Sequence, residues 1–106
     1  MNSRIINAPR AEVMAMMERR LPAAERDRLR GRSFGAVGLV QTSVPDLFYF
    51  ADLAQKASNV LTVELLGSCP QHITTLAFFG ETSAVRTAMQ AIRNETRTGG
   101  QGIGAD

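Results

Sequence analysis

The residue types best suited to chemistry in this chain are a thiol and an imidazole three positions apart. Cys69 and His72 are the only cysteine and the only histidine of the 106 residues, and both lie in the segment Gly67, Ser68, Cys69, Pro70, Gln71 and His72. Pro70 biases Cys69 toward an extended backbone, and Gly67 permits a sharp strand exit. Because so polar a segment is unlike a protein core, we expect the thiol to be exposed.

Three kinds of chemistry fit such a thiol, and none is complete within one chain. Nucleophilic catalysis would use His72 as the base for Cys69, but no carboxylate lies nearby to orient the imidazole. Zinc and iron–sulfur sites take about four protein ligands, whereas these two residues supply two at most. Several chains that meet on a symmetry axis could supply the rest. The alternative without chemistry is an inert cysteine that behaves as a small hydrophobe.

The elements that must position this segment are two apolar runs, residues 60–66 before it and residues 73–79 after it. Both are rich in β-branched and aromatic residues, and glycine closes each, so they predict a β-hairpin with the segment at its tip. Glu64 alternates with apolar residues in the first run. We expect its side chain to face solvent or a subunit contact.

Before the hairpin, the sequence predicts a strand, a helix, a charged linker or surface helix, a second strand and a second helix. The first strand covers residues 4–6, and Asn7 and Pro9 predict the start of a helix with the apolar stripe Val13, Met16, Met17 and Leu21. Residues 23–32 are the charged segment. Residues 33–42 are apolar and contain several glycines, so they predict a central strand. Ser43 and Asp46 predict a capping box at the start of the second helix. The apolar stripe of that helix is Leu47, Phe50, Ala51 and Ala54.

After the hairpin, Thr82 or Ser83 is expected to cap a last helix with the stripe Val85, Ala88, Met89 and Ile92. The glycine-rich residues 99–106 predict a disordered tail, which leaves residues 1–98 as one domain. The simplest way to bury these stripes is an α+β fold of ferredoxin-like character, with a four-stranded, mainly antiparallel sheet and helices on one face.

The composition limits the kinds of partner that we expect this protein to bind. No apolar stretch approaches the ~20 residues of a membrane span, and no leader pattern is present, so we expect a cytoplasmic protein without a membrane partner. Eight of the twelve basic residues but four of the ten acidic residues lie in the first 32. Because these charges alternate at helical spacing, a solvated helix face is favoured over nucleic-acid binding. Phosphate-binding loops, paired catalytic carboxylates and RNA-binding aromatic motifs are absent, which argues against an enzyme.

Four segments together resemble the shell domain of bacterial microcompartments, the BMC domain: residues 34–42, 51–60, 63–67 and 80–85. They follow the family pattern of a glycine-rich strand, a helix that ends near a lysine, a strand that ends in glycine, and a helix start. In ordinary members a further strand and helix follow the last matched helix. Here a strand and helix, residues 4–21, precede the first match, so the chain is similar to the circularly permuted branch.

This resemblance implies cyclic homohexamers that tile with other shell proteins around a metabolic organelle and carry a central pore. It gives Lys56 a role in contacts between neighbouring hexamers, with Arg10 as a second candidate edge residue. The segment 67–72 would border the pore. It is similar to that of a divergent branch, the U-type shell proteins of glycyl-radical propanediol microcompartments, in which an iron–sulfur cluster is held at the pore. By that resemblance Cys69 is the ligand, and each subunit contributes one thiol to a shared cluster of the 4Fe-4S type.

Two hypotheses of another class stay open on the residues alone. One is a dimeric regulatory module of ferredoxin-like fold that binds a metabolite, with Cys69 incidental. The other is a thiol enzyme that uses Cys69 and His72, which predicts a depressed thiol pKa and rapid alkylation. The subunit number separates the shell protein from the module.

Overall fold

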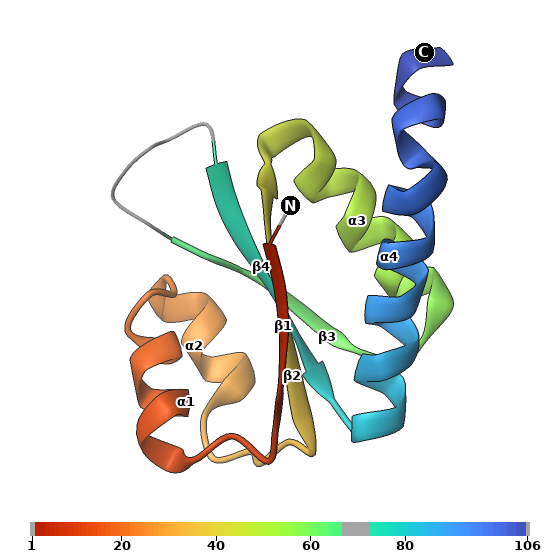
Figure 1. Ribbon diagram of the computed structural model, residues 1–106. Helices are drawn as coiled ribbons and strands as arrows, with labels where there is room; N and C mark the ends of the chain where they lie inside the picture. The colour runs from red at the N-terminus through yellow and green to blue at the C-terminus, as the bar shows by residue number, and fades with distance from the viewer. Residues whose placement is uncertain (1, 67–72, 106) are drawn as a thin grey trace.

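The computed structural model describes residues 2–66 and 73–105, with side chains as far as residue 96 (Figure 1). Four strands and four helices follow one another in the predicted order. They are β1 (Asn2–Asn7), α1 (Ala11–Glu18), α2 (Ala23–Leu29), β2 (Ala36–Ser43), α3 (Val44–Ala57), β3 (Leu61–Leu65), β4 (Ile73–Gly80) and α4 (Thr82–Ala105). The predicted hairpin is therefore confirmed as β3 and β4.

The strands form one antiparallel sheet in the order β1-β2-β4-β3. β2 and β4 lie in the centre, as their nearly continuous apolar sequences require. In β2, Gly38 pairs with Phe78 of β4 and with Ile5 of β1. A Cβ atom at Gly38 would lie 2.6 Å from Sδ of Met89, so the glycine lets α4 approach the sheet closely.

Helices cover both faces of the sheet, which corrects the expectation of helices on one face. α3 and α4 pack on one face, and α1 and α2 pack on the other (Figure 1). Successive residues of β2 point alternately into the two cores: Val40 packs with the α3–α4 layer, whereas Val37 packs with the α1–α2 layer. Both central strands carry consecutive apolar residues, 36–40 in β2 and 76–79 in β4, so the sheet needs cover on both sides, and the charged segment 23–32 supplies part of it.

The α1–α2 layer differs from its prediction in three details. α2 is a helix whose last residue, Leu29, is completely buried. In α1 the buried positions are Met14 and Met17, whereas Met16, predicted to be buried, is 56% exposed. Asn7 does not cap α1 but ends β1, and the chain then turns at Ala8, whose φ of 49° lies in the left-handed region.

The other two helices carry the predicted stripes. Leu47, Phe50 and Ala54 of α3 are buried, and so is every predicted core residue of α4. Ser43 is the N-cap of α3 as expected, but its side chain makes no capping hydrogen bond. No helix in the described part of the chain is both long and apolar enough to cross a membrane.

The backbone of α4 continues as a helix to Ala105, where glycine content predicted a disordered tail from residue 99. Helix propagation adds one hydrogen bond for each residue fixed, whereas nucleation is costly. A helix already anchored on the sheet through Val85, Met89 and Ile92 can therefore extend into residues of low helix propensity.

Candidate functional site

The candidate site is the connection between β3 and β4. Gly67, Ser68, Cys69, Pro70, Gln71 and His72 lie outside the described residues, so the predicted exposure of the thiol stays a prediction. The structure does place the two residues that flank them. Ile73 begins β4 and pairs with Ser43, the last residue of β2, while Leu66 follows the end of β3.

Leu66 is held by the chain segment that follows α1. Its backbone N–H donates to the carbonyl oxygen of Arg20 over 2.9 Å, and a guanidinium nitrogen of Arg20 lies 3.4 Å from the carbonyl oxygen of Leu66. These contacts join β3 to the α1–α2 layer immediately before residue 67. No sequence pattern pointed to this role of Arg20, because nothing in an arginine-rich segment distinguishes one guanidinium from another.

Glu64 is exposed, as expected. The hydroxyl of Thr74 on β4 donates a 2.7 Å hydrogen bond to a carboxylate oxygen of Glu64 on β3. This bond links the two strands near the ends that flank the segment 67–72. The described residues contain no group of three or more histidine, cysteine or acidic side chains that could hold a metal ion.

The two candidate edge residues lie toward the other end of the sheet. α3 begins where β2 ends and runs back toward the start of β3, so Lys56 in its last turn lies far along the molecule from Ile73. Arg10 is the N-cap of α1, after the turn that follows β1, and is exposed. Both residues are thus at helix ends near the end of the sheet where Ala36 pairs with Gly80, opposite to the end where Ser43 pairs with Ile73.

Lys56 makes an ion pair within its own helix. Its ammonium nitrogen lies 2.7 Å from a carboxylate oxygen of Asp52, one turn earlier, and both side chains are largely exposed. The hydrogen bond to Asp52 and the charge of that carboxylate raise the pKa of Lys56 above its ordinary value of 10.5, with a smaller contribution from Tyr49. Lys56 is positively charged at physiological pH even at its ordinary pKa, and the ion pair strengthens the preference for the charged form.

A cavity of about 460 Å³ opens between the residues before β2, the start of β3 and the end of β4. Phe34 and Phe79 form part of its wall, with ring centroids 5.1 Å apart, and the guanidinium of Arg32 lies 5.0 Å from the centroid of Phe34. No sequence motif pointed to it. It lies at the opposite end of β4 from Ile73 and so is separate from the candidate site.

Comparison with known proteins defines the class. The family model of the BMC domain matches residues 36–105, which is most of the chain, so the protein belongs to the BMC-domain family. None of the curated proteins matches the sequence. The predicted class, a shell protein of bacterial microcompartments with an α+β fold, is confirmed.

Two solved structures are similar over nearly their whole length. The GrpU microcompartment shell protein from Pectobacterium wasabiae is 43% identical, with a TM-score of 0.72 over 87% of this chain and 99% of that one. The GrpU microcompartment shell protein from Clostridiales bacterium 1_7_47FAA is 29% identical, with a TM-score of 0.66 over 91% of this chain and 93% of that one. Both structures are described as ligand-free. These likenesses favour the shell protein over the regulatory module and the thiol enzyme.

Proposed function

We propose that this chain is a non-enzymatic shell subunit that forms cyclic homohexamers, and that residues 67–72 of the six subunits border a central pore. Membership of the BMC-domain family supports this role, since the similar solved chains are microcompartment shell proteins.

The pore segment is proposed to bind an iron–sulfur cluster through Cys69. The available metal ligands support this proposal. One chain has one thiol, the described residues hold no group of three or more metal ligands, and a ring would bring identical thiols to one axis. A cluster supplies positive charge that makes the approach of several thiolates favourable. Because a 4Fe-4S cluster takes about four thiolates, six subunits would share it unequally. The bound cluster would relay electrons across the shell or close the pore.

The order of elements supports a circular permutation. The family match begins at Ala36, the first residue of β2, so β1, α1 and α2 all precede it. β1 nevertheless completes the sheet beside β2, where a strand from the other end of an ordinary member would have to lie.

We propose that the chain tiles with other shell proteins in the microcompartment through Lys56 and Arg10, which are exposed and lie at the end of the molecule away from Leu66 and Ile73.

Anaerobic purification followed by a visible absorption spectrum tests the cluster. We expect the wild-type chain to show broad absorption in the blue, and Cys69→Ser to lose it because the hydroxyl is a poor ligand for iron. Ser68→Ala is the matched control, since it alters the neighbouring residue and keeps the thiol, and it should retain the absorption.

A colourless wild-type protein after reconstitution with iron and sulfide would refute the cluster and leave the shell role intact. Absorption that survives in Cys69→Ser would show that the ligand is another residue.

A further inference from the structure

The cavity between the residues before β2, the start of β3 and the end of β4 has no part in the proposed ring or cluster. Its volume of about 460 Å³ falls within the range of roughly 300–1,000 Å³ that small-molecule sites occupy. Its apolar lining consists of the half-buried Phe34, Val60 and Leu61 and the buried Phe79. A small apolar group can therefore leave water by covering this lining.

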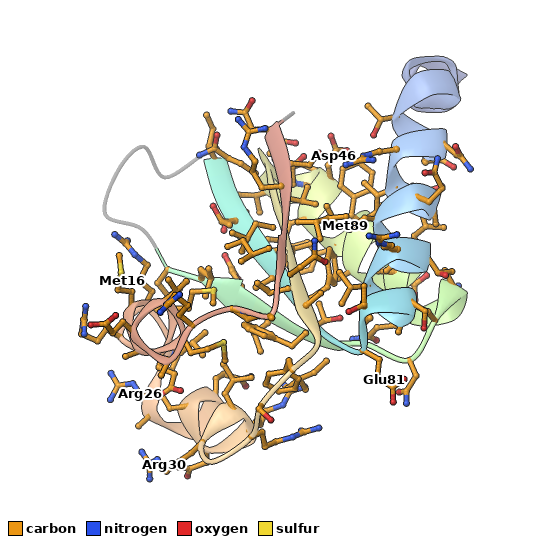
Figure 2. The ribbon with its side chains drawn as sticks, turned by 60° about the horizontal axis from the view of Figure 1, so that its bottom comes forward. Met16, Arg26, Arg30, Asp46, Glu81 and Met89 are labelled. Atoms are coloured by element: carbon orange, nitrogen blue, oxygen red, sulfur yellow. The ribbon has the colours of Figure 1, made fainter. Side chains whose placement is uncertain are left out.

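Two opposite charges also line this cavity. Of the described lining residues, Arg32 carries the one positive charge and Glu81 the one negative charge. They come from different segments, because Arg32 precedes β2 whereas Glu81 lies between β4 and the start of α4 (Figure 2). Both residues are exposed, and within the described part of the chain neither forms an ion pair with the other or with any further residue. The cavity thus offers an unpaired cation and an unpaired anion to a ligand.

The guanidinium of Arg32 is held in place and still has donors to offer. It lies 5.0 Å from the centroid of the Phe34 ring, a contact that favours one position of the cation. Its Nη1 donates a long hydrogen bond of 3.4 Å to the carbonyl oxygen of Arg28. A guanidinium has five N–H donors in one plane, and two of them match the two oxygens of a carboxylate. Arg32 can therefore bind a carboxylate while it keeps both of these contacts.

The two charges together restrict the kind of ligand. A simple anion would be attracted by Arg32 and repelled by Glu81, and a simple cation would meet the reverse, whereas a zwitterion satisfies both charges. We propose that this cavity binds a free amino acid with an apolar side chain. Its carboxylate binds Arg32, its ammonium group binds Glu81, and its side chain covers Leu61 and Phe79. This inference goes beyond the proposed function, because the cavity lies at the opposite end of β4 from Ile73 and the pore segment.

Saturation-transfer NMR on the assembled protein tests the site, because this method observes the ligand and tolerates a large receptor. The probes are L-leucine, isocaproate, which is leucine without its ammonium group, and isoamylamine, which is leucine without its carboxylate. L-leucine should bind about fivefold more tightly than either analogue, the effect expected of one exposed ion pair. Equal dissociation constants for leucine and one of the analogues would indicate a site for a single charge and overturn the proposal. The absence of saturation transfer to leucine would overturn it as well.

Two variants locate the charges. In Arg32→Gln, leucine should lose its advantage over isoamylamine, and in Glu81→Gln it should lose its advantage over isocaproate. Arg30→Gln is the matched control, because it removes a guanidinium that does not line the cavity and lies well apart from Glu81 (Figure 2), so leucine should keep both advantages. Preferences that survive in Arg32→Gln and Glu81→Gln would show that leucine binds elsewhere, and the proposal would be wrong. Circular dichroism verifies that these variants fold, as we expect for exposed residues.

Discussion

Among single residues, Lys56 shows how a neighbouring carboxylate stabilises the charged form of a side chain that we propose to contact other shell proteins. Asp52 accepts a hydrogen bond from its ammonium group and raises its pKa. A pKa raised in the folded state means that the protonated lysine favours folding below pH 10.5, and that this contribution is lost as the pH rises through the raised value. Lys56 is charged at neutral pH at its ordinary pKa, and the ion pair adds a favourable position of the ammonium group beside Asp52.

We expect Asp52→Asn to lower the pKa of Lys56 toward 10.5, because it removes the charge and leaves a weaker acceptor. The measurement is an NMR titration of the lysine side chain through the alkaline range, where Lys56 is the one lysine signal to follow. Asp46→Asn removes a carboxylate from the first turn of the same helix and should leave the titration unchanged. An identical midpoint in wild type and Asp52→Asn would show that the ion pair is absent in solution.

Single residues also show which features of the structure could be predicted from the sequence and which could not. The exposure of Glu64 and the burial of Phe50 follow from alternation and helical spacing. Met16 has the same type and spacing as its buried neighbours and was wrongly predicted to be buried, because in a helix with several closely spaced apolar positions the spacing fits more than one face. The contact of Arg20 with Leu66 depends on tertiary structure and has no local signal.

At the scale of elements, α2 is the helix that the sequence describes least well. Its charged residues predicted a surface segment, and most of its side chains are indeed exposed. Leu29 is the exception, since it is completely buried among Val37, Ala77 and Phe79 in the core of the α1–α2 layer. One apolar residue at the end of a charged segment is too little to reveal a core position.

Leu29→Ala should therefore destabilise the protein by about 2–5 kcal/mol, through lost apolar burial and the cavity left behind. Arg30→Ala, the next residue, breaks an exposed 3.3 Å ion pair with Asp27 and should change stability by less than about 1 kcal/mol. Urea unfolding at one protein concentration compares the two, because assembly contributes equally to both. Equal midpoints for both variants would mean that α2 does not pack on the sheet.

The order of elements was predictable because each has its own period and its own breakers, such as Gly80 at the end of β4 and Pro45 at the start of α3. The prediction put the helices on one face of the sheet, although the consecutive apolar residues 36–40 of β2 indicate cover on both. The disordered tail predicted from the glycines of residues 99–106 stays a prediction.

For the whole molecule, the resemblance to the BMC domain was confirmed, but assembly is a property of several chains. One thiol per subunit has a clear use when subunits share an axis. The described residues of a single chain hold the strands that flank the site, while the proposed centre lies between chains.

The measurement that tests this account most directly is the native mass of the anaerobically purified protein. We predict an assembly of six chains whose mass exceeds that of the polypeptides by one iron–sulfur cluster, and an assembly of six chains without that excess for Cys69→Ser. A dimer or a monomer as the largest species would contradict the shell ring, and six chains of bare polypeptide mass in the reconstituted wild type would contradict the shared cluster.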